Sequence, residues 1–529
     1  MSRNLIKTIP LLPILLYLSI FFAFFFRFYN IWLSDFQGDE VVAHAFLIEK
    51  ESFIQFLLTE LKGPGQYLVA KLTYSFFSWS TVYEAIARIP FVLAGFLTVI
   101  IIYKITKSIY NFKIAVFAVF FSGLSGHLAT FSRLVQYQGF VMLTAASSIF
   151  LTIKYLKNSG TKLKFPIMAG ITSGIGLLFH YNSLSYILPI ALILFWYKHF
   201  KTLFAYTISA FTVASMFYIP YVLNPSFSKT INYLYYDRIS ANFYYDSILY
   251  EIKLLFIYHP KEYMVLLSVG VVTFALTKLS KNFTSKILLL LFFAIAVTRY
   301  TIQISKTSLI RLDSLIFGLF ILDFLLKNKS AKPSDQVKNL ITLWFLFCFF
   351  AFIVFINKPL GSIFALELPM SIIAAIGIYT LYKKFPRFIV ASTIIAFIAS
   401  ISFNYQTMIN PNNSYPHKET TYIFGRMYSK MARGEEIFRS VNGFMYKRDL
   451  GQAHRDLIEL SANSGINNFM GSNEKVKTIQ FYSRGLTNIP DQPGYYLYVK
   501  NSRDGKVDPY ESLVPVIEKE NYKIYLINE

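Results

Sequence analysis

The sequence is poor in the residues that cover a soluble protein. Only 15% of its 529 residues are charged, whereas about a quarter are charged in soluble domains. A single cysteine, Cys348, lies inside an apolar run. One cysteine excludes internal disulfide bonds and cysteine-cluster metal sites, and leaves the redox compartment open. The low charge excludes an ordinary soluble protein and indicates a membrane protein.

Apolar residues take the place of the missing charges. Hydrophobic residues make up 55% of the chain and aromatic residues 18%, with 54 Phe and 38 Tyr, which suits lipid-facing helices and interfacial belts. The net charge of +22 is not gathered in a basic domain. Basic residues occur in short clusters between apolar runs, a pattern that is typical of membrane topology and argues against a nucleic-acid partner.

The apolar runs predict about thirteen transmembrane helices, and therefore an all-α polytopic membrane protein. Several runs are shorter than the roughly 20 residues that a span requires and need flanking residues to complete them. The runs lie near residues 9–29, 82–103, 114–131, 139–153, 165–181, 185–197, 202–223, 262–277, 287–297, 308–326, 339–356, 364–382 and 388–404.

Lys and Arg concentrate on one side of the predicted helices. The expected inner segments hold 21 Lys and Arg in 59 residues, and the expected outer segments hold 11 in 117 residues. Cytoplasmic loops carry such an excess of positive charge. The sequence therefore predicts a multi-pass protein of the cell (plasma or inner) membrane with a cytoplasmic N-terminus. Because the number of spans is odd, the C-terminus is expected to be extracytoplasmic.

The composition becomes polar near residue 405. We expect residues 1–404 to form a transmembrane domain and residues 405–529 to form a small soluble α+β domain on the outer side. Residues 417–441 have a helical pattern, and "GYYLYVK" and "NYKIYLINE" have the pattern of strands.

The first outer loop, residues 30–81, is expected to hold two interfacial helices. The segment "VVAHAFLIEKESFIQFLLTEL" has apolar residues at helical spacing and is followed by the breaker "KGPG". The next run, "QYLVAKLTYSFFSW", is too short to span a membrane. Amphipathic helices of this kind lie along the membrane surface.

An acidic pair, Asp39 and Glu40, follows the first span. One interpretation is structural, because Asp is favoured at a helix N-cap and Glu in the first turn. The other is catalytic, because a carboxylate can take the proton from an attacking hydroxyl. The interpretations are compatible, since a cap holds a carboxylate rigidly. Adjacent helical side chains diverge by about 100°, so one of the pair is expected to act as the base while the other braces the loop or contacts the acceptor.

Further polar residues stand at the outer ends of predicted helices. Lys62 lies in "KGPGQY", Arg133 and Tyr137 in "FSRLVQYQG", and His180 and Tyr181 in "LLFHYN". Taken singly, the two cations suit interfacial anchors, and His180 suits a buried, hydrogen-bonded residue. Taken together with the acidic loop, Lys62 stands where a phosphate could be bound.

Later outer segments add four cations, Arg299, Lys306, Arg311 and Lys358. Cations on the side opposite to the positive-inside bias need a reason, and binding an anionic headgroup is one. No phosphate-cradling glycine loop, nucleophile elbow or metal-ligand spacing occurs in the sequence. The residues require no cofactor and predict no metal site, although a divalent metal is left open.

The order of these motifs resembles a known enzyme group. "GDE" after the first span, "KGPGQYLVAKL", "EAIARIPFVLAGF" and "FSRLVQYQG" are similar to motifs of the polyprenyl-phosphate-dependent glycosyltransferases of the GT-C type, in the protein O-mannosyltransferase and aminoarabinose-transferase group. The resemblance covers about residues 1–200. It implies that Asp39 is the catalytic base and Glu40 its partner, and that Lys62 and Arg133 lie near the donor phosphate.

The resemblance implies an inverting glycosyltransferase of the cell envelope, either a hexosyl or a pentosyl transferase. A sugar would pass from a polyprenyl-phosphate donor to a hydroxyl of a lipid, glycan or protein acceptor on the outer face. The later cations would help to hold the phosphate, and Tyr137, His180 and Tyr181 would line the acceptor or sugar pocket. Surrounding membrane lipids would be the remaining partner.

Three alternatives stay open, one of them a non-catalytic assembly scaffold. A lipid flippase or transporter predicts internal repeats and ionisable residues near mid-membrane, whereas the ionisable residues here lie mostly at span ends. An envelope-polymer polymerase or ligase would place its key residues in a large late loop.

Overall fold

The computed structural model describes most of the apolar part of the chain and the core of the polar C-terminal part. The described residues are 11–31, 36, 39–47, 52–78, 83–158, 162–235, 258–279, 284, 287, 288, 291, 312–328, 332–355, 363–409, 450–466, 469–471, 494–499, 508–519 and 522–527.

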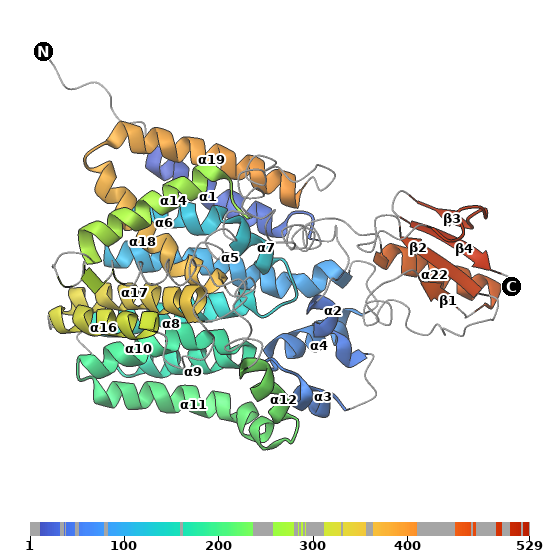
Figure 1. The fold of residues 1–529 in the computed structure, drawn as a ribbon, viewed down its shortest axis with the longest axis horizontal. Coiled ribbons are helices and arrows are strands. Elements are labelled where there is room, and N and C mark those ends of the chain that lie inside the picture. The colour runs from blue at the N-terminus through green and yellow to red at the C-terminus, as the bar shows by residue number, and fades with distance from the viewer. Residues whose placement is uncertain are drawn as a thin grey trace, which may run out of the picture.

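Within the described residues, helices follow one another without a strand up to residue 409 (Figure 1). The α-helices are α1 (Leu11–Phe28), α2 (Asp39–Ala43), α3 (Phe53–Thr59), α4 (Gly65–Phe77), α5 (Tyr83–Ile109), α6 (Phe112–Leu124), α7 (Gly126–Ser132), α8 (Gln138–Lys157), α9 (Lys164–Phe179), α10 (Leu184–Trp196), α11 (Phe200–Leu223), α12 (Phe227–Asn232), α14 (Lys261–Phe274), α16 (Leu312–Lys327), α17 (Pro333–Phe349), α18 (Phe364–Tyr382) and α19 (Pro386–Met408). Short 3₁₀ segments are η1 (Ala45–Leu47) and η2 (Tyr181–Ser183), and π-helical turns are η4 (Ala275–Leu279) and η5 (Phe350–Phe355).

Eight of the described helices are long and apolar enough to cross a membrane, and α6 with α7 makes a ninth, broken span. The helices α9 and α10 are apolar but shorter. Each apolar run expected from the sequence coincides with a helix except residues 287–297, most of which lie outside the described residues. A polytopic, multi-pass membrane protein is thus confirmed, and the count of thirteen spans stays a prediction.

The long helices pack closely where small residues meet. A Cβ added at Gly377 of α18 would lie 1.8 Å from the carbonyl oxygen of Gly270 in α14, and one added at Gly270 would lie 2.5 Å from the carbonyl oxygen of Ala374. The two backbones are therefore in contact. In a bilayer, where lipid tails are as apolar as leucine, this close van der Waals packing supplies much of the attraction between helices.

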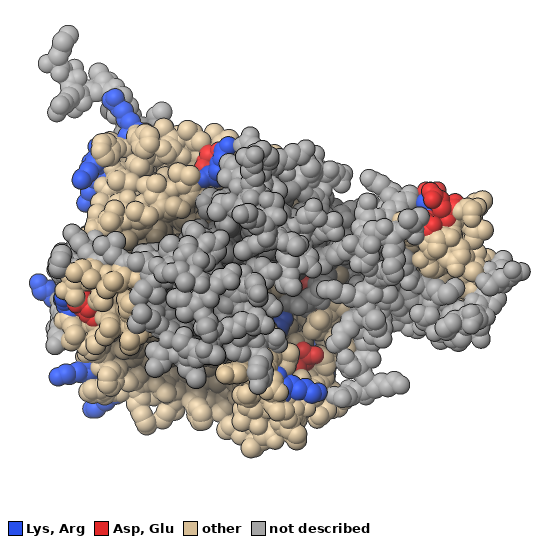
Figure 2. Space-filling view, viewed as in Figure 1, with Lys and Arg blue, Asp and Glu red and all other residues tan. Residues whose placement is uncertain are grey.

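Lys and Arg side chains of the described residues gather at one end of the bundle, where α10 and α16 end (Figure 2). Figure 2 shows Lys and Arg side chains gathered at this end, with a largely uncharged surface beside it. Loops expected on the inner side meet there: the hydroxyl of Tyr197, after α10, donates to the carbonyl of Asn328, after α16 (2.7 Å). Lys113 at the start of α6 lies 5.5 Å from the ring centre of Tyr382 at the end of α18.

The expected span over 114–131 is not straight. The helices α6 and α7 meet at Ser125 with a bend of 56°. Ser125 caps α7, because its hydroxyl accepts the N–H of Leu128 (3.0 Å). Its neighbour Gly126 packs so tightly that a Cβ would lie 2.1 Å from the carbonyl oxygen of Tyr258. The bend therefore follows from a new helix cap and from a contact that only glycine permits.

The carbonyls freed by this break all have partners. The last four carbonyls of α6, residues 121–124, would otherwise lack the helical N–H that follows. The Tyr263 hydroxyl donates to the first (2.6 Å), the Arg27 guanidinium donates to the next two (3.3 and 2.9 Å), and the Asn404 amide donates to the last (3.1 Å). A break inside a membrane requires such partners, because lipid provides none.

The first loop is divided into more pieces than the sequence predicts. A single helix was expected over 41–61, but α2 and η1 are followed by a new helix, α3. Ser52 explains the restart, because its backbone is extended and its side chain accepts the N–H of Gln55. The second expected helix is present as α4. Figure 1 shows α2, α3 and α4 together at one end of the bundle.

The C-terminal part has the expected mixture of helix and strand. One helix, α22 (Leu450–Ser464), packs through Leu457 on a four-stranded sheet. Its strands are β1 (Phe469–Gly471), β2 (Gly494–Val499), β3 (Ile517–Glu518) and β4 (Tyr522–Ile527). They lie in the order β1-β2-β4-β3, with β1 parallel to β2 and the other pairs antiparallel.

Both strands expected from the sequence are confirmed, as β2 and β4. The helix expected at 417–441 lies outside the described residues. The last long helix, α19, continues to Met408, past the expected domain boundary at residue 404.

The contact between α14 and α18 predicts a position-specific effect of added methyl groups. Gly377→Ala should lower the free energy of unfolding by about 1–3 kcal/mol, because the new methyl has to push two backbones apart. Gly318→Ala in α16 is the control, since nothing lies within 4 Å of its added Cβ. There a helical Gly→Ala change should stabilise by roughly 0.5–1 kcal/mol. Thermal unfolding in detergent measures both, and equal shifts would contradict the packing described.

Candidate active site

Glu40 is buried in the first turn of α2 and is held on three sides. Its side chain is 0% exposed. Arg88 of α5 donates two hydrogen bonds to it, from Nε to Oε1 and from Nη2 to Oε2, both 2.8 Å long. The backbone N–H of Val135, after α7, donates to Oε1 as well (3.0 Å). This carboxylate therefore ties α2 to α5 and to the segment that leads into α8.

Arg88 completes the arrangement with a bond to the end of the first span. Its Nη1 donates to the carbonyl of Ile31 (2.7 Å), and the guanidinium lies 5.5 Å from the ring centre of Phe36. Fork-to-fork pairing of arginine and carboxylate is the strong, directional form of an ion pair. Arg88 is part of the motif "EAIARIP", but the motif alone did not indicate that this arginine pairs with Glu40.

His44 belongs to the same buried layer. Its Nδ1 lies 2.8 Å from the carbonyl of Glu40 and its Nε2 lies 2.9 Å from the Tyr83 hydroxyl, so both ring nitrogens have protein partners. The ring also stacks on Phe36. Within the described residues no group of three or more His, Cys, Asp or Glu side chains is placed to hold a metal ion.

Asp39 is the first residue of α2. Its side chain lies outside the described residues, so its assignment as the base stays a prediction. Glu40 braces the loop through Arg88 and Val135, and its part as the partner of the base stays a prediction.

The turn before α4 lies against the start of α8, through Lys62, and against the end of α9, through Gly63. Gly63 is pressed on α9, since a Cβ there would lie 2.2 Å from the carbonyl oxygen of Leu178. No other residue type fits so close to a backbone. The Lys62 ammonium lies 5.6 Å from the ring centre of Tyr137, within the range of a cation–π interaction.

Three aromatic rings continue from this ammonium. The rings of Tyr137 and His180 stack, with their centres 3.8 Å apart and their planes at an angle of 11°. The ring centre of Tyr181 lies 3.8 Å from that of His180. His180 ends α9 in an extended conformation, and Tyr137 directly precedes α8. The structure thus brings together four of the residues predicted from the sequence: Lys62, Tyr137, His180 and Tyr181.

Arg133 has a different environment. Its guanidinium donates to the carbonyls of Phe26 and Tyr29 (2.6 and 2.8 Å) and of Asn30 (3.0 Å), at the C-terminal end of α1. Desolvation by the surrounding protein and the nearby charge of Arg88 lower the pKa of Arg133 to about 9, so it is charged at neutral pH. A cation at this position caps the helix and complements its dipole.

The four later cations, Arg299, Lys306, Arg311 and Lys358, lie outside the described residues. Their proposed part in binding a phosphate stays a prediction.

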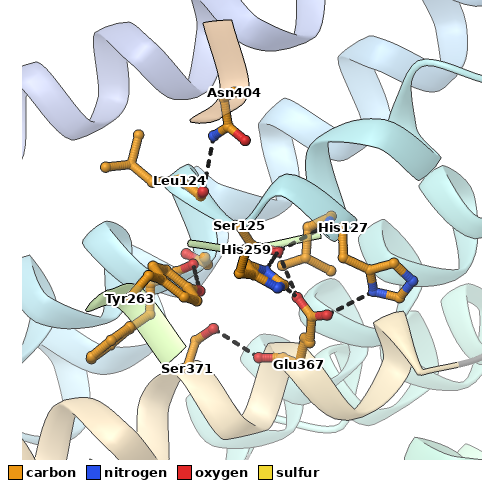
Figure 3. Close-up of polar contacts among 12 residues, drawn as sticks. Leu124, Ser125, His127, His259, Tyr263, Glu367, Ser371 and Asn404 are labelled. Carbon is orange, nitrogen blue, oxygen red and sulfur yellow. Dashed lines mark hydrogen bonds and ion pairs between the residues drawn. The ribbon is translucent and has the colours of Figure 1, made fainter. Parts of the chain in front are cut away.

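A buried polar cluster was missed by the sequence analysis (Figure 3). Glu367, in the first turn of α18, is 2% exposed and accepts a hydrogen bond from the Ser125 hydroxyl (2.5 Å). Its other oxygen lies 2.7 Å from Nδ1 of His127. His259, just before α14, places Nε2 3.0 Å from the Ser125 oxygen. Burial and the charge of Glu367 raise the pKa of the adjacent Tyr258. The signal for this cluster in the sequence was the presence of ionisable residues inside apolar runs.

This cluster is joined to the candidate site by α7. Ser125 caps the start of α7 and Arg133 follows its end. Val135 and Tyr137, which contact Glu40 and Lys62, come next in the chain. A short helix therefore connects the Glu367 cluster to both halves of the candidate site.

Comparison with known proteins agrees with the motifs. Residues 62–222 match the family model described as dolichyl-phosphate-mannose-protein mannosyltransferase. Among solved structures, ArnT from Cupriavidus metallidurans bound to undecaprenyl phosphate is similar along the whole chain, with a TM-score of 0.52, 11% identity, and 98% of each chain covered. The chain has the ArnT fold.

ArnT of the same organism in the apo state gives a TM-score of 0.50 at 12% identity, with 97% of each chain covered. No curated protein matches the sequence. The family model covers the Lys62 turn, the Arg-Ile-Pro motif and the Ser-Arg motif. The resemblance to the polyprenyl-phosphate-dependent GT-C group is confirmed.

The pairing of Glu40 with Arg88 predicts an asymmetric response to mutation. Arg88→Met should lower the free energy of unfolding by about 3–5 kcal/mol, because it leaves a buried carboxylate unpaired. Adding Glu40→Gln should recover part of that loss, since the buried charge is then gone. Asp323→Asn, which breaks a more exposed pair with Lys327 on one helix, should cost only about 0.5 kcal/mol or less. Unfolding in detergent compares the three, and a double variant no more stable than Arg88→Met would contradict this account.

Proposed function

We propose that this chain is an inverting membrane glycosyltransferase that takes its sugar from a polyprenyl-phosphate donor. The observation that carries the proposal is the meeting of the acidic loop, the Lys62 turn and the Tyr137–His180–Tyr181 stack at one end of the bundle. The acidic loop precedes the segment that matches the mannosyltransferase family model, and the Lys62 turn and the aromatic stack lie within it. The ArnT fold, seen in a structure bound to undecaprenyl phosphate, supports the same donor class.

The Lys62 ammonium is the proposed partner of the donor phosphate. It stands beside aromatic rings in a turn that is fixed by the packing of Gly63. A cation held in advance of the reaction stabilises the negative charge that develops on a leaving phosphate. The aromatic stack next to it offers a flat surface for the sugar.

Arg133 is the weaker candidate for the phosphate, because its guanidinium already makes three hydrogen bonds to the end of α1. We assign it to holding the first span in place. Arg299, Lys306, Arg311 and Lys358 are the proposed sources of a second cation.

Asp39 is the proposed general base. On a helix its side chain diverges from that of Glu40 by about 100°, and Glu40 is committed to Arg88. The carboxylate of Asp39 takes the proton from the acceptor hydroxyl as the oxygen attacks the anomeric carbon. A new glycosidic bond forms, the bond from this carbon to the phosphate oxygen breaks, and the polyprenyl phosphate leaves with the electron pair.

The chain is proposed to act on the outer face of the cell membrane, with its N-terminus in the cytoplasm and residues 405–529 outside. The transferred sugar is a hexose or a pentose, and the acceptor hydroxyl belongs to a lipid, glycan or protein. The excess of Lys and Arg in the expected inner segments supports this orientation.

Purified protein incubated with a panel of polyprenyl-phosphate sugars tests the proposal. We expect at least one donor to be consumed, with release of polyprenyl phosphate, when a hydroxyl acceptor extract is present. If no donor of the panel is bound or consumed, the proposal is wrong.

Asp39→Asn should abolish transfer while donor binding stays normal. The amide keeps the size and capping ability of the side chain but cannot accept the proton. Loss of a general base lowers turnover by about 10²–10⁴-fold. Turnover and donor affinity are measured on the same preparation. Normal turnover in this variant would mean that the acidic pair acts only as a helix cap.

Lys62→Gln should weaken transfer by removing a charge from the phosphate. We expect a loss of roughly 10²-fold or more in turnover, by analogy with deleting one preorganised electrostatic donor. Lys71→Gln is the matched control, since Lys71 is on α4, the helix that follows the Lys62 turn, but its ammonium lies over the ring of Phe53 (3.8 Å). Equal effects of the two substitutions on turnover would contradict the role given to Lys62.

A further inference from the structure

Gln66, in the first turn of α4, is a buried amide without a hydrogen-bond partner. Its side chain is 0% exposed, and neither Oε1 nor Nε2 has a partner among the described residues. Buried polar groups in native proteins nearly always have one, because burial without a bond forfeits the bonds to water. A buried amide that bonds neither to the protein nor to water is therefore a candidate for binding a ligand.

The side of α4 that carries Gln66 faces the protein. Residues 66, 70 and 73 share one side of the helix, as the spacing i, i+4, i+7 requires, and Ala70 is 0% exposed. Leu68 and Leu72 lie on the opposite side and are 47% and 60% exposed. The amide is thus directed inward, away from the exposed side of the helix that carries the leucines.

The elements around this side are those of the candidate site. Ala70, one turn from Gln66, packs in a cluster with Val41 of α2 and with Val135. Val41 comes shortly after the acidic pair, and Val135 is the residue whose N–H holds Glu40. On the other side of Gln66, Lys62 contacts Tyr137. The amide therefore lies on α4 between the Lys62 turn and the contact with the acidic loop.

The hydrogen-bonding groups of the amide indicate which part of the donor it can bind. A side-chain amide offers two N–H donors and a carbonyl acceptor. A phosphate presents only acceptors and a polyprenyl tail presents neither, so each leaves the carbonyl of Gln66 without a partner. A sugar hydroxyl both donates and accepts, and it satisfies both ends of the amide.

We propose that Gln66 binds hydroxyl groups of the donor sugar and is a specificity-determining residue of the transferase. The inference rests on the proposed function, since it assumes a polyprenyl-phosphate sugar at this site. It adds the residue that recognises the sugar, as distinct from Lys62, which recognises the phosphate.

Gln66→Met tests the proposal, because methionine has a similar length and no amide. The ligands are undecaprenyl phosphate and the undecaprenyl-phosphate sugar selected from the donor panel. We expect the sugar-bearing ligand to bind about tenfold or more weakly, since two hydrogen bonds are lost, and undecaprenyl phosphate to bind as before. The unfolding temperature should be unchanged or higher, because a buried unpaired group has been removed.

Thr106→Val is the matched control. Thr106 in α5 is 0% exposed and its hydroxyl has no partner among the described residues. Its replacement should leave the unfolding temperature unchanged or higher, like Gln66→Met, without affecting either ligand. Gln66→Leu serves as a second apolar variant if Gln66→Met does not fold.

The outcomes separate the two proposals. A variant at Gln66 that binds both ligands like the wild type overturns this inference and leaves the proposed function standing. A lowered unfolding temperature with equal weakening of both ligands also overturns it, since Gln66 would then be a structural residue. If the wild type binds neither ligand, the proposed function fails, and the inference fails with it.

Discussion

The buried pair of Glu40 and Arg88 fixes the loop on which the candidate site depends. A carboxylate and a guanidinium out of water are stable only when each is paired and hydrogen-bonded, and here two bonds join them while Ile31 and Val135 supply the rest. The short helix α2, only five residues long, would not hold a position on its own. The helix α2 is held in place because its second residue, Glu40, is bonded to the long spanning helix α5.

A second constraint reaches the same place from inside the bundle. Glu367 fastens the start of α7 through Ser125 and His127, and Arg133 fastens the segment after it to the end of α1. Since α7 is short and capped, the distance between these two anchors has little freedom. The aromatic stack that begins at Tyr137 is positioned by this segment rather than by a flexible loop, which suits a site that has to be organised before its ligand arrives.

The sequence predicted what local pattern determines. Span positions follow from the lengths of apolar runs, and Lys62, Tyr137 and His180 were placed on one side because they lie in or beside successive outer loops. Partner choice is a different matter. Glu40 pairs with a residue 48 positions away and Glu367 with one 240 positions away, and no periodicity encodes such distances. The break at Ser125 was missed in part for the same reason, since one of its two causes is the contact of Gly126 with a distant backbone.

The partners of the broken span also bear on the order in which the protein is made. The carbonyls at the end of α6 take donors from Arg27, which is synthesised earlier, and from Tyr263 and Asn404, which are synthesised much later. An unpaired carbonyl in the hydrocarbon layer costs several kcal/mol. A nascent chain that ends before residue 404 therefore holds its third span in an incomplete state. The break at Ser125 receives its last donor only when the last membrane helix has joined it, so assembly of the end that carries the candidate site is tied to completion of the whole membrane part.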